Sequence, residues 1–368
     1  MRLQVPPKPK SENGVNPASH PAKKLQFSYS RQLLDWLQQE SISFAFTTYQ
    51  TCRLGLIGVQ NQRLVGFERL FDRAMGLYAQ ADSLYLSTKY QVWHLENVLI
   101  QGQSYQGHDK LYIPRTGYTT GDLDIHDIVV DRDGKLLFVS SLLNCLATTS
   151  AHNSSTPLWK PPFVSKVINE DRCHLNGLAM VEGQPRYVSA IAQSDVVGGW
   201  REKRRDGGCI IDVRTNEVIA TGFSMPHSPR WYRDRLWVLN SGAGEFGYVD
   251  ISTGQFEAIT FCPGYARGLS FWKDWAIVAL SKPRSQDKTF SGLPLDDRLT
   301  AKDVNPRCGF LIIDLNTGAI AHWLTFETIV SELYDVQILP GVQNPTVLGF
   351  QTSEISQLLT LDPMGQLF

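Results

Sequence analysis

Residues 121–141 read GDLDIHDIVVDRDGKLLFVSS, and this stretch decides the fold. From Asp127 onward it consists of a short apolar run, the polar turn DRDG and a second apolar run that ends in two serines. Such a pattern predicts a β-hairpin. Just ahead of the hairpin, Asp122, Asp124 and His126 occupy every second position. That spacing places three ionisable side chains on one side of an extended chain, so a polar entrance precedes an apolar hairpin.

The hairpin pattern recurs along the chain. Its copies are residues 76–88, 127–141, 177–190, 228–241 and 268–281, with a degenerate sixth copy at 335–350. A second hairpin pattern, in which a strand ends in Asp and a Thr-Asn or Thr-Gly turn follows, occupies 210–222, 248–261 and 312–326. Two hairpins per unit make four antiparallel strands, which is the repeat of a β-propeller blade.

The chain is therefore predicted to be all-β, with a single β-propeller domain over residues 26–368. The repeats indicate six blades, or seven if the N-terminal strands form most of a blade of their own. Those N-terminal strands are expected to close the ring by pairing with the C-terminal segments VLGFQ (347–351) and SQLLTLD (356–362). Helical periodicity is confined to SRQLLDWLQQ (30–39), and residues 1–25 have the polar, proline-containing composition of a disordered tail.

Composition limits the classes of partner. The 368 residues include 35 basic and 36 acidic side chains, a net charge of −1, which argues against nucleic acid or an anionic membrane as the main partner. The six cysteines are scattered without a C-x-x-C motif, and we expect a cytoplasmic protein. One basic run, WREKRR (200–205), predicts a solvated loop or, alternatively, a rim contact with an anionic ligand.

The propeller repeat predicts where polar side chains gather. All inner strands of a propeller run in the same direction, so the residues just ahead of them meet at one mouth of the central channel. Polar or ionisable residues occupy five of these six positions, although apolar strands follow them. The six residues are Met75, His126, Asn176, His227, Arg267 and Tyr334. Asp124 and His174 lie two residues earlier in their repeats.

Three histidines at one mouth have two interpretations. In the first, His126, His174 and His227 bind a divalent transition metal through neutral imidazoles, with Asp122 or Asp124 as a further ligand or an orienting group. Histidine-rich coordination favours zinc, iron or copper over calcium. In the second, each histidine is a hydrogen-bonded channel residue around a cluster of water. Asp127 points to the opposite side of the strand and is expected to support blade packing.

The two carboxylates offer a way to decide. Asp122 and Asp124 facing one partly dry channel repel each other and need a cation or raised pKa values. Arg267 or Arg73 could supply that cation, and the mouth would then be a polar cup for a ligand. Otherwise a divalent ion is the natural partner. The residues expected to bind such a ligand are Arg73, Asp122, Asn176, Tyr334 and Asp335.

Two classes of function follow. The first is a metal-dependent enzyme, hydrolytic or oxidative, that acts on a small molecule or a peptide at the mouth. In it Asp124 is the candidate catalytic base and Arg267 the anion clamp. The second is a non-catalytic propeller that binds a ligand or a partner protein on the same rim, since propellers host both kinds of function.

Several long motifs resemble those of a known family. The strings TGDLDIHD, CHLNGLAM, PHSPRWY, LWVLNSGAGEFGYVD and YARGLSFW are similar to an uncharacterised bacterial family, described as a conserved hypothetical protein or domain of unknown function. The resemblance covers roughly residues 40–365 and implies no established activity. More distantly, the architecture resembles the gluconolactonase and strictosidine-synthase-like six-bladed propellers. Their divalent ion is held by Glu, Asn and Asp, and Asn176 resembles that Asn, but histidines here replace the carboxylates, which argues against lactonase chemistry and calcium.

Overall fold

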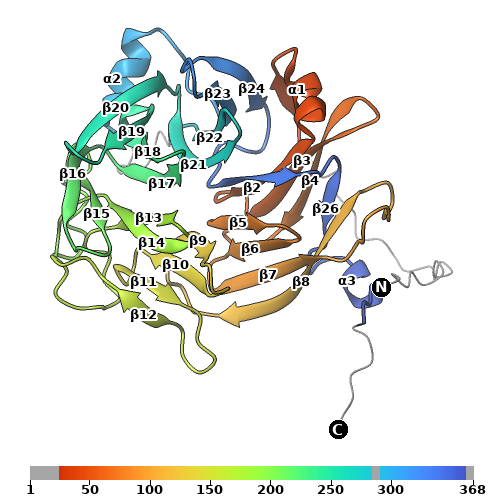
Figure 1. Cartoon of the computed structure of the whole chain (residues 1–368), viewed down its shortest axis with the longest axis horizontal. Helices are drawn as coiled ribbons and strands as arrows, with labels where there is room; N and C mark the ends of the chain where they lie inside the picture. Colours follow the sequence, from red (N-terminus) through yellow and green to blue (C-terminus); the bar gives the residue numbers. More distant parts are fainter. Residues whose placement is uncertain (1–24, 284–290, 362–368) are drawn as a thin grey trace.

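The computed structural model describes residues 25–283 and 291–361. Its strands form six separate sheets of four or five strands, arranged in a ring (Figure 1). Each sheet is one blade of a β-propeller. The predicted six-bladed fold is confirmed, and the seven-bladed alternative is wrong.

Blades one to three follow one another along the chain, each with its first strand innermost. The strands of blade one are β5 (Leu77–Gln80), β6 (Ser83–Ser87), β7 (Gln91–Asn97) and β8 (Lys110–Thr119). Those of blade two are β9 (Ile125–Val130), β10 (Leu136–Ser140), β11 (Cys145–Thr148) and β12 (Thr156–Trp159). Those of blade three are β13 (Leu175–Val181), β14 (Gln184–Ala190), β15 (Gly208–Asp212) and β16 (Val218–Phe223).

Blades four and five repeat this order, and blade six combines both ends of the chain. The strands of blade four are β17 (Pro226–Tyr232), β18 (Arg235–Asn240), β19 (Glu245–Asp250) and β20 (Gln255–Phe261). Those of blade five are β21 (Tyr265–Trp272), β22 (Trp275–Ser281), β23 (Gly309–Asp314), β24 (Ile320–Phe326) and the added β1 (Phe27–Tyr29). Those of blade six are β25 (Val336–Pro340), β2 (Ile42–Thr48), β3 (Arg53–Gln60) and β4 (Arg63–Leu70).

The ring closes in blade six, where the innermost strand comes from the C-terminal part of the chain. β25 pairs antiparallel with β2, from Phe46 against Val336 to Ile42 against Pro340. The prediction that N- and C-terminal strands close the ring is therefore confirmed. The prediction that residues 347–351 and 356–362 supply the closing strand is wrong. Residues 345–347 form β26, which pairs in parallel with β8 at the edge of blade one, and the short helix α3 (Glu354–Gln357) follows.

Hydroxyl groups at the ends of the second strands tie neighbouring blades together. In five of the six blades a Ser or Thr donates its hydroxyl to a backbone carbonyl of the next blade, at the start of that blade's inner strand or just ahead of it. Ser87 reaches the carbonyl of Ile125 at 3.1 Å, and Ser281 reaches that of Leu333 at 2.9 Å. The small residues that end each hairpin in the sequence are therefore links between blades.

The turns show why the Asp-turn pattern recurs. Asp212, Asp250 and Asp314 each end the third strand of a blade. In each case the carboxylate accepts a hydrogen bond of 2.8 Å from the backbone N–H two residues later. An Asx turn of this kind satisfies the turn's backbone locally, so each hairpin is encoded by its own few residues.

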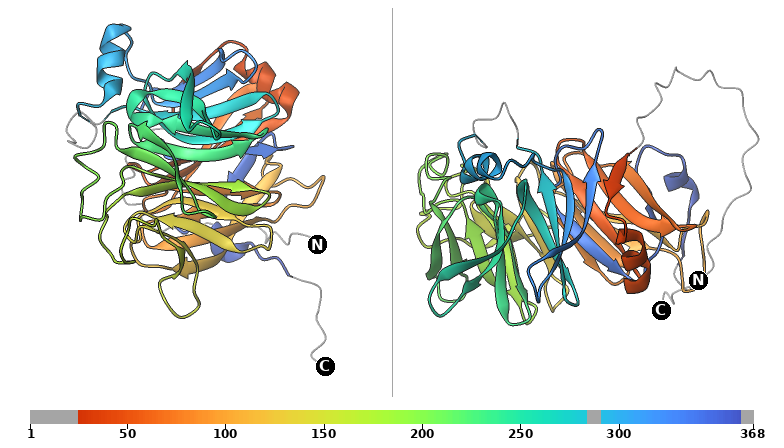
Figure 2. Two further views of the ribbon diagram at one scale, coloured as in Figure 1. Left: turned by 60° about the vertical axis from the view of Figure 1, so that its left-hand side comes forward. Right: turned by 90° about the horizontal axis from the view of Figure 1, so that it is seen from above.

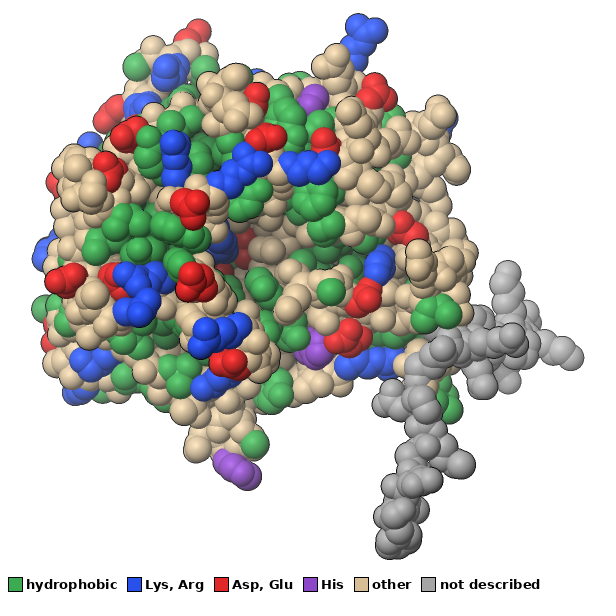
Figure 3. All heavy atoms as spheres, in the orientation of Figure 1, with side chains coloured by type: hydrophobic (Ala, Val, Ile, Leu, Met, Phe, Trp, Pro, Cys, Tyr) green, Lys and Arg blue, Asp and Glu red, His purple; other side chains and the backbone are tan. Residues whose placement is uncertain are grey.

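The propeller is a disc whose two faces carry different elements (Figure 2). α1 (Leu33–Glu40) leads into β2 on the face that bears the turns between first and second strands, and α2 (Pro294–Ala301) follows β22 on the other face. That second face holds the mouth. Figure 3 shows the turn-bearing face, which is hollowed at the centre where the other end of the channel opens.

Helix α1 confirms the predicted amphipathic segment, and Leu33, Trp36 and Leu37 are buried on its inner side. The predicted tail lies outside the described residues up to residue 24, and Leu25 packs against the core that α1 covers. Among the helices that the structure describes, none has the length and apolar character needed to cross a membrane.

Candidate functional site at the channel mouth

A cavity of about 310 Å³ opens at the mouth, where the inner strands begin. Six polar or ionisable residues that the sequence places at the mouth line it. They are Asp124, His126, His174, His227, Arg267 and Tyr334. The remaining lining residues are Tyr49, Met75, Leu142, Asp171, Trp200, Arg201 and Met225. The repeat therefore locates most of the mouth, but not all of it.

The chain enters the inner strands through a repeated kink. Arg73, Asp124, His174 and Met225 each lie two residues ahead of a mouth position, and all four have left-handed backbone angles, with φ between 46° and 51°. A non-glycine residue in this conformation costs roughly 1 kcal/mol or more and persists where the surroundings enforce it. The same kink in four successive blades marks the mouth as a place where strain is held.

The kink sets the orientation of two imidazoles. Nδ1 of His126 lies 2.9 Å from the carbonyl oxygen of Asp124, and Nδ1 of His227 lies 2.9 Å from that of Met225. In both rings Nδ1 therefore donates its proton to a carbonyl, which leaves Nε2 as the basic nitrogen. The hydroxyl of Ser141 also lies 2.7 Å from Nδ1 of His126.

Both rings are uncharged at neutral pH. Burial lowers the pKa of His126 to about 4. Burial, with the charge of Arg267 adding to it, lowers the pKa of His227 well below its ordinary value. Neutral imidazoles with a free Nε2 can accept a proton, accept a hydrogen bond or coordinate a metal.

His174 has a different partner. Its Nδ1 lies 2.9 Å from Oδ2 of Asp171, and Nε1 of Trp200 donates to the same oxygen at 2.8 Å. Burial raises the pKa of Asp171, but the electrostatic interaction with His174 and the hydrogen bonds from His174 and Trp200 lower that pKa below its ordinary value. Asp171 is therefore an ionised carboxylate that orients the imidazole of His174.

The structure brings two of the three histidines into contact. The rings of His126 and His174 lie 4.8 Å apart between centroids, edge to face. His227 lines the same cavity and packs its ring against Tyr265, with centroids 5.5 Å apart. Within residues 25–283 and 291–361, no three His, Cys, Asp or Glu side chains form a group that could hold a metal ion. Metal binding by the three histidines stays a prediction.

An arginine stands beside the two acids. Arg73 donates from Nη1 to Oδ2 of Asp122 at 3.0 Å and from Nη2 to Oδ1 of the same carboxylate, a bidentate pair. Its Nη2 also lies 3.8 Å from Oδ1 of Asp124. Arg73 thus pairs with Asp122 and lies near Asp124, so its single positive charge reduces the repulsion between the two carboxylates without neutralising both. Neither Arg73 nor Asp122 is among the residues that line the cavity.

Arg267 forms the opposite wall together with aromatic rings. Its guanidinium carbon lies 5.0 Å from the ring centroid of Tyr265 and 5.2 Å from that of Tyr334. Burial raises the pKa of Tyr334 well above its ordinary value, so its phenol stays protonated. The cavity therefore receives the imidazoles of His126 and His174 from blades two and three, and a cation and a phenol, Arg267 and Tyr334, from blades five and six.

Asn176 and Asp335, predicted to bind ligand at the mouth, lie one level deeper in the channel. The amide of Asn176 donates to the carbonyl of Pro226 at 2.9 Å, and Asp335 accepts the backbone N–H groups of Leu77 and Val336 at 3.0 and 2.8 Å. Both line a narrow space of about 10 Å³ beneath the mouth cavity. The amide nitrogen of Asn176 and both carboxylate oxygens of Asp335 contact neighbouring backbone, and neither residue lines the mouth cavity, so ligand binding by the two residues stays a prediction.

At this deeper level, residues with a side chain alternate with glycines from one blade to the next. Asp127, Ser228 and Asp335, in blades two, four and six, each accept a backbone N–H from the inner strand of the next blade. Glycine takes the same position in blades one, three and five, and a Cβ at Gly177 would lie 2.5 Å from Cδ of Pro229. Side chains thus fit the narrow axis only in every second blade, and the packing role predicted for Asp127 is confirmed.

Sequence reasoning missed Asp171 and Trp200. Asp171 lies in the connection between blades two and three, and Trp200 in the loop between β14 and β15, so neither has a repeat position. The available signals were the spacing of Asp171 and His174 in DRCH and the tryptophan that opens the basic run.

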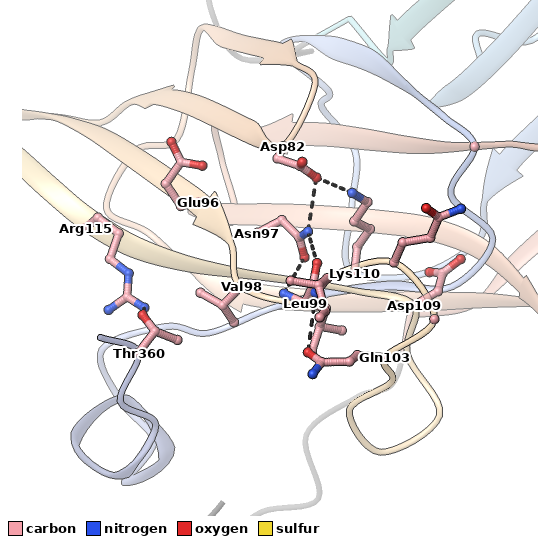
Figure 4. Close-up of a pocket in the computed structure, with 14 residues that line it drawn as sticks. Asp82, Glu96, Asn97, Val98, Leu99, Gln103, Asp109, Lys110, Arg115 and Thr360 are labelled. Atoms are coloured by element: carbon pink, nitrogen blue, oxygen red, sulfur yellow. Dashed lines mark hydrogen bonds and ion pairs between the residues drawn. The ribbon is translucent and has the colours of Figure 1, made fainter. Parts of the chain in front are cut away.

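A larger cavity, of about 1060 Å³, lies on blade one (Figure 4). Its charged and polar groups bind one another: Asn97 and Lys110 both contact Oδ1 of Asp82, and Arg115 donates to the hydroxyl of Thr360. Asp109 accepts the backbone N–H groups of residues 343 and 344. The cavity therefore lacks the directed, titratable groups of the mouth.

Residues 31–348 match a family described as Domain of unknown function (DUF4915). The chain belongs to this family. That agrees with the resemblance seen in its motifs, and DUF4915 carries no assigned activity. No curated protein matches the chain.

Solved structures resemble this DUF4915 protein in fold. A chain in the crystal structure of a nidogen/laminin complex has a TM-score of 0.50 at 9% identity, over 82% of this chain and 99% of that one. A catalytically inactive virginiamycin B lyase from Staphylococcus aureus, solved with quinupristin, has a TM-score of 0.39 at 12% identity, over 65% of this chain and 73% of that one. The likeness to the nidogen/laminin complex concerns the fold alone.

Proposed function

We propose that the mouth is the active site of a hydrolase that acts on a small molecule or a peptide, with His174 as the general base. One observation carries this proposal: Asp171 holds Nδ1 of His174 at 2.9 Å, while the ring lines the cavity. A carboxylate in this position fixes the tautomer and stabilises the imidazolium that forms when Nε2 takes up a proton.

The surrounding residues fit that role. His126 is uncharged at neutral pH because burial lowers its pKa to about 4. Its ring, 4.8 Å from that of His174, therefore does not repel a newly formed imidazolium. Trp200 holds the second hydrogen bond to Oδ2 of Asp171 and so keeps the carboxylate in place. Arg267, across the cavity, is positioned to stabilise negative charge on the substrate or on the group under attack.

The role of Asp124 changes in this proposal. Its carboxylate lies 3.8 Å from Arg73 and 3.7 Å from Nδ1 of His126. Its carboxylate lies within ion-pair distance of a guanidinium, and its backbone carbonyl orients His126 directly. We therefore assign proton transfer to His174 and an orienting role to Asp124.

The metal-dependent form of the proposal would place zinc, iron or copper on Nε2 of His126, His174 and His227, whose rings would have to move closer together, because no three such groups in the described residues are placed to hold an ion. Support comes from the hydrogen bonds already made by each Nδ1, an arrangement that leaves Nε2 for a metal. A bound ion would supply Lewis-acid activation of water. The proton transfer proposed for His174 does not require it, so the two forms can be tested separately.

A second candidate is a non-catalytic ligand cup on the same rim. The observation that favours it is the pairing of Arg73 with Asp122 and its approach to Asp124 at 3.8 Å, which supplies a cation beside the two acids without a metal. Turnover discriminates this candidate from the enzyme.

The test is a panel of chromogenic esters, lactones and peptides assayed with the wild type, His174→Ala and Asp171→Asn. We expect a substrate whose turnover falls by about 10²–10⁴-fold in both variants. His152→Ala, which changes an exposed histidine in the loop between β11 and β12, is the control and should leave turnover unchanged. Hydrolysis that survives in His174→Ala would remove His174 as the base, and binding without turnover of any substrate would favour the ligand cup.

We also propose that the protein is cytoplasmic. Its six cysteines are free thiols, and five of them are buried. This is the usage expected in a reducing compartment. Fractionation of cells that express the untagged protein tests it.

A further inference from the structure

The basic run at residues 200–206 forms part of the mouth rim. It lies in the loop between β14 and β15 and reads WREKRRD, with four basic and two acidic side chains. Trp200 and Arg201 line the mouth cavity, whereas Lys203, Arg204 and Arg205 lie outside the lining. We call these four basic side chains the basic rim.

The basic rim is held in place. The guanidinium carbon of Arg201 lies 4.4 Å from the ring centroid of Trp200, and a Cβ at Gly198 would come within 2.9 Å of its Nη1. Arg201 is thus packed between an aromatic ring and a bare backbone. Arg204 donates to the carbonyls of Arg201 and Ser291 at 2.8 and 3.1 Å, and Arg205 donates to that of Gly292. Binding an anion here requires little further ordering of side chains.

These contacts fix the side chains without neutralising them, because the partners are backbone carbonyls and an aromatic ring. Across the described ranges, 25–283 and 291–361, one carboxylate lies within ion-pair distance of the basic rim, that of Asp297 at 3.8 Å from Arg205. Both members of this pair are more than half exposed, and a pair so exposed contributes little. The positive charge of the rim is therefore largely left for an incoming ligand.

The same loop exposes two apolar side chains. Val196 and Val197 are 68% and 64% exposed, although they immediately precede the glycine pair that packs Arg201. A molecule confined to the cavity of about 310 Å³ would contact Arg201 but not the remainder of the rim. A ligand that uses the whole rim must be longer, with acidic groups for the arginines and apolar groups for the valines. An acidic peptide has this chemistry.

We propose that the basic rim binds an acidic peptide segment that leads into the mouth cavity. The inference names the ligand class for the function proposed above and rests on it only in taking the mouth as a ligand site. Arg201 lies at the junction, because it belongs both to the rim and to the cavity lining.

The test is fluorescence anisotropy of the full chain with a short labelled peptide of alternating glutamate and leucine. The same peptide with glutamine in place of glutamate is the comparison. We expect the glutamate peptide to bind about tenfold more tightly, an advantage that added salt removes. The double variant Arg204→Glu/Arg205→Glu should weaken its binding by about tenfold or more.

The matched control is the double variant Arg132→Glu/Arg233→Glu. It makes the same change of net charge in turns on the opposite face, at side chains 63% and 48% exposed. Equal binding of the two peptides, or an equal loss in the control, would overturn the proposal. So would sedimentation with phosphatidylserine vesicles without binding of the glutamate peptide. The assay measures binding and not turnover, so its failure leaves the proposed chemistry of His174 to be judged by its own test.

Discussion

Nη1 of Arg230 lies 2.6 Å from Oδ2 of Asp127, so an arginine of blade four pairs with a carboxylate of blade two beneath the mouth. Arg230 also donates to the carbonyl of Leu178, in the blade between them. Asp127 in turn accepts the backbone N–H groups of Ile128 and Leu178. One ion pair therefore fastens three successive blades around the channel and supports the floor of the site.

Breaking this pair should be costly. Arg230→Met leaves the carboxylate of Asp127 buried without its cation, and such a loss typically destabilises a protein by about 3–5 kcal/mol. We expect a decrease of this size in the free energy of unfolding measured with urea. The double variant Arg230→Met/Asp127→Asn, which removes both charges, should recover part of the loss. An unfolding free energy unchanged in Arg230→Met would show that the pair does not hold the blades together.

A second carboxylate at the same level predicts a pH effect on stability. Burial raises the pKa of Asp335 to about 7, and Asp127 adds to the shift although Arg230 opposes it. In the unfolded chain an aspartate has a pKa of about 3.9. As the pH rises from about 4 to about 7, the unfolded chain releases this proton first, so the contribution of Asp335 to stability falls across that window.

Asp335→Asn removes this titration. The stability of the variant relative to the wild type should therefore increase with pH, and urea unfolding at about pH 4.5 and about pH 7.5 measures the difference. Comparing variant with wild type cancels the opposite contribution of His126 and His227, whose lowered pKa values reduce stability as the pH falls. A constant difference between the two pH values would mean that Asp335 has an ordinary pKa.

The mouth imidazole His126 should not titrate in the physiological range. Burial lowers its pKa to about 4, and its Nδ1 is held by the carbonyl of Asp124. The ring C2–H signal, assigned by its absence in His126→Gln, should stay constant in NMR spectra between about pH 5 and about pH 8. The exposed His152, outside the mouth, provides the reference signal. A midpoint for His126 near the ordinary histidine value would contradict a buried, uncharged imidazole at this position.

The sequence predicts elements that local hydrogen bonds stabilise better than elements that depend on pairing between distant segments. The blades could be predicted because each hairpin is encoded locally, as Asp212, Asp250 and Asp314 show by capping the same turn. The closing strand was missed because β25 and β26 follow each other like a hairpin, yet they pair with strands more than 200 residues away.

The same distinction applies to the site residues. His126, His227, Arg267 and Tyr334 could be placed because they share one repeat position. Asp335 shares instead the position of Asp127, one residue later, and this equivalence places it below the mouth. Asp171 comes from a connection that no other blade copies, so its contact with His174 depends on the path of a single loop.

The last prediction concerns the cation at the mouth. Arg73 makes a bidentate pair with Asp122 and lies 3.8 Å from Asp124, so it occupies the electrostatic role that a metal would otherwise take. Arg73→Met leaves Asp122 and Asp124 without this cation, with Asp124 lining the same cavity as the three imidazoles, and zinc uptake by the untagged variant should exceed that of the wild type. Elemental analysis after dialysis against zinc measures it, with Arg132→Met as the control for loss of one exposed arginine. Equal zinc in Arg73→Met and wild type would show that Arg73 does not substitute for an ion.

One equivalent of zinc, iron or copper in the wild type, lost in His174→Ala, would instead establish the metal-dependent form of the enzyme.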